Sequence, residues 1–435
     1  MKQSFKLIVL LPFLFLLHPS AGLFAQSGYR ISIQLDGLND TILLLASYNG
    51  HKQFVIDTAF RSTKNNYVFT GKDPLPTGMY FLAGENKSRL FDFIVSGKQV
   101  FTIKGKKDAI PLSLSCKENA ENQTFFDYIR FLSEKQKQQQ NFNALSKKYA
   151  PNSDSAKIVN NQMNLLNEEV NRYIHGIINS FSGSFISTFL KAMQEPEIPQ
   201  APKLANGRID STYSYRYYKS HYWDNINLAD DRLVRTPFLH SKVEQYLTKL
   251  TSPAPDSLIV AIDNLFKMAG NNEETFKYLM WYLTIQYENS EIMGYDTIFV
   301  HLVDTYYSDP KMKWMNTTVK DNLIKRAHTL RPILIGNQAP EMILMDTLMQ
   351  PVSLHKLQAN YTLIYFWDPD CSHCKKETPL LRSFYEKNKQ QFNLEVYAVC
   401  MDTSWNDMKK YIRANNMSWV NVNGFYSMTA DFREL

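Results

Sequence analysis

Cysteine is scarce in this chain, with 4 among 435 residues. So few cysteines exclude the disulfide scaffold that holds small secreted domains together. The 16 glycines follow no Gly-X-Y period, which excludes a collagen-like fibre. Charge of one sign is also sparse, because 48 basic residues stand against 42 acidic ones. The resulting net charge of +6 is small and scattered, so we expect no nucleic-acid partner.

The composition is otherwise that of an ordinary folded protein. Hydrophobic residues make up 44% of the chain and charged residues 21%, which excludes disorder over most of its length. At roughly 150 residues per domain, a chain of this length is expected to form about two to four domains.

The first 25 residues have the features of a secretory signal peptide. Lys2 and Lys6 precede an apolar run of 11 residues, Leu7 to Leu17, which is shorter than the ~20 residues that span a bilayer. Small residues follow, and we expect cleavage after Ala25, with a permanent membrane anchor as the alternative. No later stretch approaches ~18 consecutive apolar residues. The sequence therefore predicts an exported protein with no integral membrane segment after cleavage.

Residues 26–110 are predicted to form an all-β sandwich or barrel. Short runs of alternating apolar and polar residues, such as YRISIQL at 29–35, are separated by turn residues. Asn49-Gly50 between two of these runs is typical of a hairpin. Since no catalytic constellation is visible among the runs, we interpret this region as an accessory or docking domain.

Residues 111–332 are predicted to form an all-α domain. Apolar residues recur there at three- and four-residue intervals, most clearly over 125–140 and 156–181. No tidy period of about 30 to 45 residues is visible, so the pattern does not indicate a repeat array.

One stretch of the helical region, 212–225, holds six aromatic residues. A stacking surface for a sugar or a peptide is one interpretation, and a helix packed by its aromatic face is the other. No convergent carboxylates accompany the aromatics, which favours the packed helix. Just beyond it, Asp230 and Asp231 beside Arg232 are expected to form local ion pairs rather than a metal site.

Residues 333–435 have a β-α-β-α pattern. Continuous apolar runs at 361–367 and 392–402 predict buried strands, and helical patterns follow each of them at 371–388 and 405–416. Continuous apolar strands that alternate with helices are typical of a parallel sheet covered by helices.

Two cysteines at the start of the first of these helices are the clearest chemical signal. Cys371 would lie at the helix N-terminus, where backbone N–H groups and the helix dipole stabilise a thiolate. We therefore expect its pKa to fall below the free value of ~8.5. Cys374 lies one turn further on, close enough to resolve a mixed disulfide, and should be more buried and less acidic.

Three neighbours are candidates for tuning this pair. A cationic or hydrogen-bonding imidazole at His373 would favour the Cys371 thiolate, unless that residue is only a solvent-exposed part of the turn. Glu377 lies on nearly the same helix face as Cys374, where its carboxylate would accept a proton or raise thiol pKa values; a solvated surface glutamate is the alternative. Pro379 lies inside the helix and is expected to kink it.

A metal site is the competing interpretation of two cysteines at this spacing. Zinc takes four ligands, and a second Cys-x-x-Cys or Cys-x-x-His pair is missing. Cys116 and Cys400 are expected to be buried free thiols. We therefore predict neither a metal nor another cofactor.

The motif resembles that of the TlpA/ResA-type thiol-disulfide oxidoreductases of bacterial envelopes, which have a thioredoxin fold. Trp367 stands where that family has its active-site tryptophan, and Glu377 and Pro379 match its C-x-x-C-x-x-E-x-P pattern. The resemblance implies that Cys371 is the nucleophile, that Cys374 is the resolving cysteine of a redox-active disulfide, and that Glu377 tunes their pKa values.

The arrangement of the whole chain also resembles multidomain envelope proteins common in Bacteroidota. In that arrangement a signal peptide, a β-rich module and a helical module precede a C-terminal thioredoxin-like domain, which IGNQAP at 335–340 would open here. The resemblance implies a periplasmic or envelope-associated location. It also implies protein thiols and disulfides as partners, including an upstream envelope thiol reductase or oxidase.

Two departures from the family pattern matter. Tyr365 stands where thioredoxin itself carries a buried acid, so a proton relay through that acid is missing and more weight falls on Glu377. No proline follows Pro379, whereas the fold continues with a strand preceded by a cis-proline. We therefore expect the domain at 333–435 to be truncated before that strand, or its redox activity to be impaired, and strand 361–367 to lie at the sheet edge.

The predicted function is thiol-disulfide exchange with protein substrates in the cell envelope. A peroxiredoxin-like antioxidant would need a Pro-x-x-x-Thr-x-x-Cys arrangement, and no threonine precedes Cys371 at that spacing. A non-catalytic binding or scaffold protein is the third interpretation, in which the β and helical domains perform the recognition.

Overall fold

The computed structural model describes residues 28–62, 66–150, 153–429 and 432. The predicted signal peptide, 1–25, lies outside the described residues. Contacts divide the chain into two compact units, residues 1–246 and 247–435, which are considered separately below. Within the described part of the chain, no helix combines the length and the apolar character that crossing a membrane requires.

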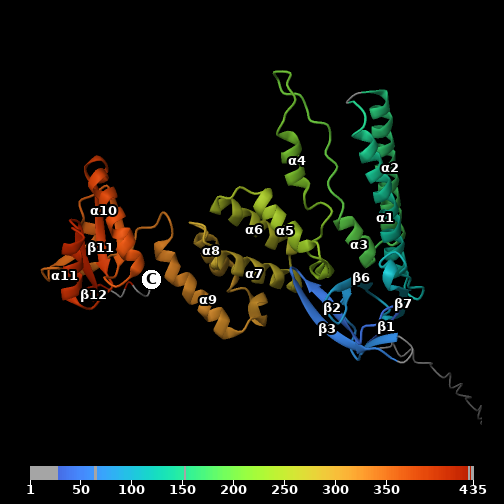
Figure 1. The fold of residues 1–435 in the computed structure, drawn as a ribbon, viewed down its shortest axis with the longest axis horizontal. Coiled ribbons are helices and arrows are strands. Elements are labelled where there is room, and N and C mark those ends of the chain that lie inside the picture. Colours follow the sequence, from blue (N-terminus) through green and yellow to red (C-terminus); the bar gives the residue numbers. More distant parts are fainter. Residues whose placement is uncertain (1–27, 63–65, 151–152, 430–431, 433–435) are drawn as a thin grey trace, which may run out of the picture. The chain divides into compact units, whose positions relative to one another are not determined.

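Two β-sheets open the first unit, as the alternating sequence pattern predicts (Figure 1). They share one apolar core, so the inward-facing side chains of both sheets are buried together. Strands β2 and β3 form the antiparallel hairpin expected around Asn49-Gly50, and Gly50 adopts the positive φ of 57° that the turn requires. One sheet has the order β4-β1-β7, built from β1 (Tyr29–Asp36), β4 (Asn66–Gly71) and β7 (Val100–Lys106). The other has the order β3-β2-β5-β6, built from β2 (Ile42–Asn49), β3 (Lys52–Phe60), β5 (Gly78–Ala83) and β6 (Arg89–Val95).

Helices follow the sheets in the first unit. The two long helices α1 and α2 pack side by side (Figure 1). Buried Asn122 in α1 ties this pair to the β-sheets, because its amide bonds both the N–H and the C=O of Ile94 in β6, each at 2.7 Å. The helices are α1 (Ala120–Ser146), α2 (Asp154–Ser180), α3 (Phe185–Ala192), α4 (Tyr213–His221) and α5 (Leu239–Lys249), whose last three residues belong to the second unit.

The aromatic stretch 212–225 is packed only in part. No residue of α4 is fully buried, but Tyr213, Tyr217 and Tyr218 are half-buried. The Tyr218 ring meets that of Tyr222 edge-on, and buried Tyr222 stacks on Tyr246. The ion pairs expected just downstream are confirmed, because Arg232 pairs with Asp230.

After the end of α5, the second unit continues with four helices that pack on one another, α6 against α7 and α8, and α8 against α9. They confirm the helical character predicted for the middle of the chain. Their bounds are α6 (Pro255–Ala269), α7 (Glu273–Glu288), α8 (Asp296–Tyr306) and α9 (Thr317–Leu330).

The C-terminal region forms a five-stranded sheet in the order β10-β11-β12-β8-β9. Strands β10, β11 and β12 are parallel, whereas β8 pairs antiparallel with both β12 and β9. The predicted β-α-β-α order is confirmed, and three further strands, β8, β9 and β12, extend the sheet. The elements are β8 (Ile343–Asp346), β9 (Pro351–Ser353), β10 (Tyr361–Trp367), α10 (Ser372–Phe392), β11 (Leu394–Cys400), α11 (Trp405–Ala414) and β12 (Val420–Ser427).

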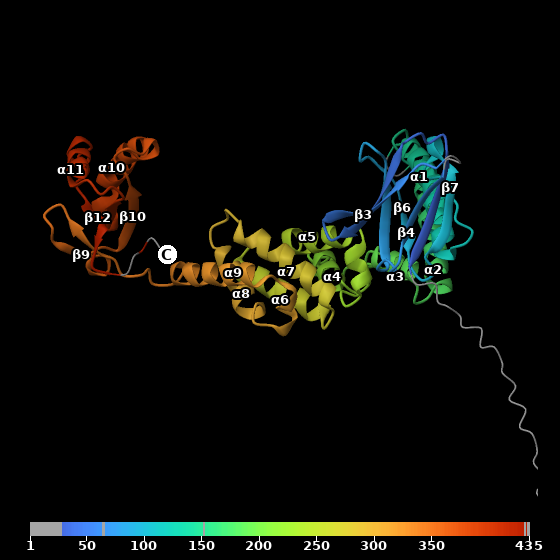
Figure 2. The same ribbon diagram turned by 90° about the horizontal axis from the view of Figure 1, so that it is seen from below.

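Both helices of this region cover the same face of the sheet (Figure 2). The strand order moves in one direction from β10 to β12, and right-handed crossovers then place both connecting helices on one side. Central strand β11 is buried on both faces: Val396 and Ala398 face the helices, whereas Tyr397 and Val399 face a second apolar cluster. Strand β10 lies at the edge of the sheet, as the sequence predicts.

Candidate redox site

Cys371 begins helix α10. Strand β10 ends at Trp367, and a tight turn follows, in which the Asp368 side chain accepts a hydrogen bond from the Asp370 N–H at 2.7 Å. Cys371 is then the N-cap residue, and its Sγ accepts the Cys374 N–H at an N···S distance of 3.5 Å. The sequence folds in this way because a thiol is a small acceptor that can satisfy an otherwise unpaired N–H of the first helical turn.

This position makes the Cys371 thiol acidic. The backbone N–H of Cys374 is the largest cause of a lowered Cys371 pKa, followed by the Cys374 side chain; the backbone N–H of His373 adds to the effect. The negative charge of Asp368 acts in the opposite direction. Because a thiolate is the form that attacks disulfides, the partly exposed Cys371 is the more nucleophilic of the two thiols.

Cys374 has the opposite character. Burial is the largest cause of its raised pKa, and the adjacent Cys371 sulfur raises it further. A backbone hydrogen bond from Asp368 and a side-chain hydrogen bond from Tyr365 lower it in part. Both cysteines are free thiols in this structure, and their pKa values differ in the direction that the sequence predicts.

Behind Cys374 lies a cluster of three hydroxyl groups that the sequence alone did not reveal. The Thr378 hydroxyl donates to the Cys374 carbonyl oxygen at 2.8 Å. The Tyr365 hydroxyl lies 2.9 Å from the Thr378 oxygen, and the Tyr411 hydroxyl lies 3.1 Å from it. The only signals in the sequence were the four-residue spacing from Cys374 to Thr378 and the alternation that turns Tyr365 toward the helix. We name these three residues the hydroxyl cluster.

The other predicted site residues are placed as follows. Trp367 is 1% exposed and stacks on Tyr411, with ring centroids 4.9 Å apart. Pro379 lies inside α10. His373 and Glu377 are both exposed, and the effect of His373 on Cys371 comes from its backbone N–H. Tuning by the His373 imidazole and by the Glu377 carboxylate stays a prediction.

Two protein-family models match the chain. Residues 335–431 match the AhpC/TSA family, and residues 151–328 match a domain of unknown function, DUF5106. The first match covers the sheet, the cysteine pair and both covering helices. The C-terminal domain is thioredoxin-like. The predicted fold class, with N-terminal β-sheets, a helical middle region and a C-terminal α/β domain, is thereby confirmed.

Individual relatives of the thioredoxin-like domain are thiol-disulfide oxidoreductases by name. The thiol-disulfide oxidoreductase ResA of Bacillus cereus is 25% identical over 85 residues, which are 20% of this chain and 49% of that protein. The chain thus spans about half the length of this curated relative. The domain resembles the TlpA/ResA-type oxidoreductases, as its motif predicts.

Solved structures resemble the chain over parts of its length. A domain of a possible thiol-disulfide isomerase from Cytophaga hutchinsonii is 35% identical, covering 21% of this chain and 61% of that one, with a TM-score of 0.20. A thiol:disulfide interchange protein from Bacteroides sp. is 31% identical, covering 22% and 60%, also with a TM-score of 0.20. A thioredoxin-like protein from Bacteroides caccae is 17% identical, covering 52% and 83%, with a TM-score of 0.39.

The two remaining cysteines lie in apolar clusters of the core. Cys116 and Cys400 are free and buried, as predicted, and burial raises the pKa of each thiol to about 12. Among the residues that the structure describes, no three or more His, Cys, Asp or Glu side chains are grouped so that they could hold a metal ion.

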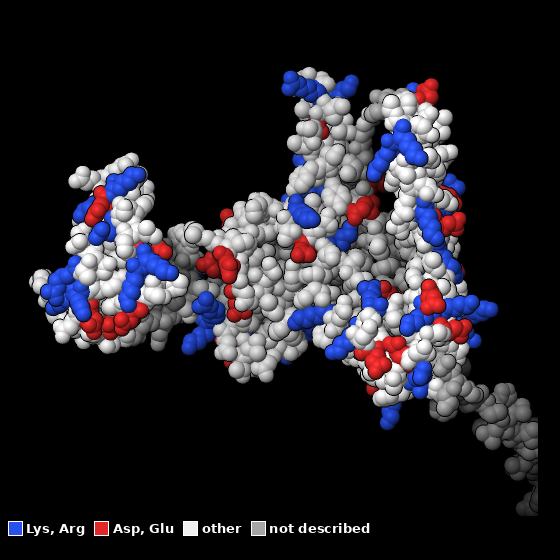
Figure 3. Space-filling view, in the orientation of Figure 1, with Lys and Arg blue, Asp and Glu red and all other residues white. Residues whose placement is uncertain are grey.

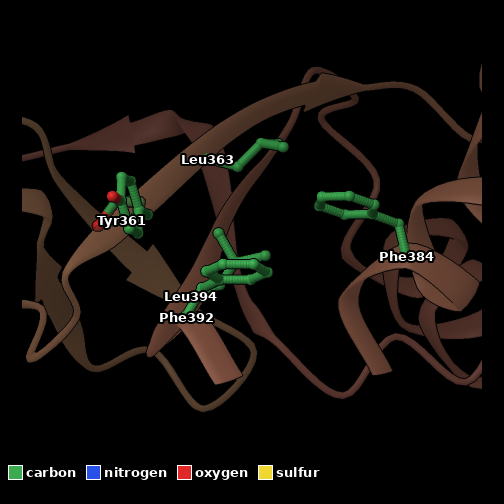
Figure 4. Close-up of a pocket in the computed structure, with 6 residues that line it drawn as sticks. Tyr361, Leu363, Phe384, Phe392 and Leu394 are labelled. Atoms are coloured by element: carbon green, nitrogen blue, oxygen red, sulfur yellow. The ribbon is translucent and has the colours of Figure 1, made fainter. Parts of the chain in front are cut away.

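An apolar hollow of about 490 Å³ lies elsewhere on the thioredoxin-like domain (Figure 4). It is lined by Tyr361 and Leu363 at the start of β10 and by Phe384, Phe392 and Leu394 around the end of α10. The cysteines lie at the other end of both elements, so this hollow is separate from the redox pair.

On the face of the molecule shown in Figure 3, acidic and basic side chains are interspersed.

Proposed function

We propose that this protein exchanges thiols and disulfides with protein substrates in the cell envelope through Cys371 and Cys374. One observation carries the proposal: Cys371 caps α10 with its sulfur, which lowers its pKa, while burial raises the pKa of its neighbour Cys374. An acidic attacking thiol followed by a less acidic thiol one turn later is the arrangement that disulfide exchange requires. The thiol-disulfide oxidoreductases among the relatives support this chemistry.

The reaction has two steps. The Cys371 thiolate attacks one sulfur of a substrate disulfide, forms a mixed disulfide and releases the other substrate sulfur as a thiolate. Cys374 then loses its proton and attacks the Cys371 sulfur, which forms the Cys371–Cys374 disulfide and releases the second substrate thiolate. Two electrons have passed to the substrate, whose thiolates take up protons from solvent. Run in reverse, the same steps oxidise a substrate dithiol.

The surrounding residues take supporting roles in this proposal. Trp367 is buried and stacked on Tyr411, and it fixes the start of the turn that carries Cys371. Pro379 bends α10, and the charged forms of His373 and Glu377 adjust the thiol pKa values from the exposed side. The export signal predicted at 1–25 directs the protein to the periplasm or the cell envelope. An envelope thiol reductase or oxidase there regenerates the cysteine pair.

Trapping of the mixed disulfide tests the proposal. In a Cys374→Ser variant, Cys371 still attacks a substrate disulfide, but no second thiol resolves the mixed disulfide. Incubation with insulin should therefore yield a covalent complex that a reductant cleaves. The matched control is the variant that also carries Cys371→Ser, which should yield none. If Cys374→Ser forms no complex while Cys371 remains open to alkylation, exchange is contradicted and the binding or scaffold interpretation gains support.

A further inference from the structure

The hydroxyl cluster behind Cys374 contains a hydrogen-bond pattern with a defined direction. Buried Thr378, 0% exposed, has one hydroxyl hydrogen and donates it to the Cys374 carbonyl oxygen. Its oxygen must therefore accept from its other two neighbours, the hydroxyls of Tyr365 and Tyr411. Tyr411 is held in place by stacking on Trp367. The three groups are thus ordered by contacts from β10, α10 and α11.

Tyr365 also lies beside Cys374. Its hydroxyl is 2.9 Å from that of Thr378, which bonds the Cys374 carbonyl oxygen, and the Tyr365 and Cys374 side chains pack against the same apolar cluster. As a donor toward the Cys374 sulfur, the Tyr365 hydroxyl lowers the pKa of that thiol. The Tyr365 pKa is itself raised to about 12, chiefly by burial, so the phenol keeps its hydrogen at physiological pH. A group in this state does not remove the Cys374 proton as a base. It serves instead as a donor to the thiolate that remains after the proton has left.

Cys374 needs such a donor, because resolution requires its thiolate in a partly buried position. A charged sulfur loses hydration on burial, and a hydrogen bond to the charged form compensates for part of that loss. When the Tyr365 hydrogen turns from Thr378 to the sulfur, the Thr378 oxygen is not left without a hydrogen-bond donor. The Thr378 oxygen still accepts from Tyr411, so the cluster tolerates both positions of the hydrogen.

We propose that Tyr365 donates its hydroxyl hydrogen to the Cys374 thiolate during resolution of the mixed disulfide, and that Thr378 and Tyr411 are positioning residues for this donation. The inference rests on the proposed function and deepens it. In the step, Cys374 releases its proton to solvent and the Tyr365 hydrogen turns to its sulfur. The thiolate then attacks Cys371, the bond from Cys371 to the substrate breaks, and the leaving substrate thiolate is protonated by solvent.

A symmetric aromatic disulfide with a coloured thiolate product separates the two steps. The reduced full chain should release one equivalent when Cys371 attacks and a second when Cys374 resolves the mixed disulfide. In Tyr365→Phe, we expect the second release to slow by roughly tenfold at neutral pH, because one hydrogen bond to a charged group is lost. The midpoint of its pH profile should rise by about one unit. The first release should stay within about twofold.

The control variant is Tyr361→Phe, which makes the same change at an exposed position of the same strand. A second release that is equally fast, with the same pH midpoint, in Tyr365→Phe and Tyr361→Phe would overturn the inference. Absence of the first release from the unmodified chain would instead contradict the proposed function.

Two further variants decide the question if Tyr365→Phe does not fold. Thr378→Val removes the oxygen that holds both tyrosine hydroxyls, and it should slow the second release and raise its pH midpoint. Thr378→Ser keeps the hydroxyl and should restore both values. A purely structural role for Thr378 predicts no such rescue in the pH profile, and equal profiles for the two variants would overturn the inference.

Discussion

The sulfur of Cys371 lies 3.5 Å from the backbone nitrogen of Cys374 and accepts its N–H. One residue thereby both caps a helix and carries a reactive thiol. The same helix turn brings the two cysteines together, because residues three apart lie on one face. The cap and the redox pair are therefore one piece of local structure.

The first prediction concerns the acidity of this cap. Alkylation of Cys371 should have a pH midpoint below the ~8.5 of an unstructured cysteine, because the N–H groups of α10 stabilise its thiolate. The measurement is the rate of iodoacetamide labelling against pH, with labelled Cys371 identified by mass spectrometry. The Cys374→Ser variant removes competition from the second thiol. A midpoint at or above that of a free cysteine in a short peptide would contradict the proposed role.

Much of the thioredoxin-like domain could be predicted from local sequence. The buried strand, the cysteines and the helix after them form one continuous stretch, so their arrangement follows from hydrophobic pattern and helix capping. Strand β12 was not predicted, because its sequence VNVNGFYS mixes apolar residues with asparagine and glycine, which are uncommon in strands. Pairing with β11 and β8 on both sides overrides that weak local preference.

The hydroxyl cluster could not be predicted in the same way. Thr378 and Tyr411 are 33 residues apart, and they meet only because α10 and α11 cover the same face of the sheet. In the aromatic stretch, spacing predicted a helix but could not show that full burial is reached only at Tyr222. In both cases the missing information was tertiary.

The second prediction is that acid weakens the contact between the β2–β3 hairpin and α5. The rings of His51 and His240 lie 4.9 Å apart, and burial is the largest cause of a lowered pKa for each. Lys52 also lowers the His51 pKa, whereas Glu244 raises that of His240. The unfolded chain therefore binds protons more readily, and stability should fall as pH drops below the unfolded value of ~6.5.

Urea titration of the full chain at neutral and at acidic pH measures this loss. His240→Gln should reduce the difference in unfolding midpoint between the two pH values. His175→Gln, a change at an exposed position of α2, is the matched control and should leave the difference unaltered. An unchanged difference in His240→Gln would mean that other groups cause the pH dependence.

The third prediction concerns the attachment of α1 to the β-sheet. Asn122→Ala removes both hydrogen bonds to Ile94 and leaves a buried N–H and C=O without these partners. We expect the free energy of unfolding of this unit to fall by about 2 to 3 kcal/mol, since each unsatisfied buried group costs ~1–3 kcal/mol. Hydrogen exchange of the Ile94 amide should also become faster.

Asn143→Ala provides the comparison for this change, because Asn143 is an exposed residue of the same helix. That variant should alter the free energy of unfolding by less than about 0.5 kcal/mol. Equal losses in the two variants would show that the Asn122 amide does not secure α1.

The fourth prediction concerns Asp368, whose negative charge raises the pKa of Cys371 against the larger effect of the backbone N–H groups. Asp368→Asn removes this charge but keeps the Oδ1 that accepts the Asp370 N–H, so the turn is preserved. The Cys371 thiolate is then opposed by one charge fewer, and the alkylation midpoint should move to lower pH. Because a more stable thiolate favours the dithiol, the variant should also be a stronger oxidant in equilibrium with glutathione.

The control is Asp370→Asn, which neutralises the more exposed carboxylate of the same turn. If it shifts the alkylation midpoint of Cys371 as far as Asp368→Asn does, only the net charge of the turn matters.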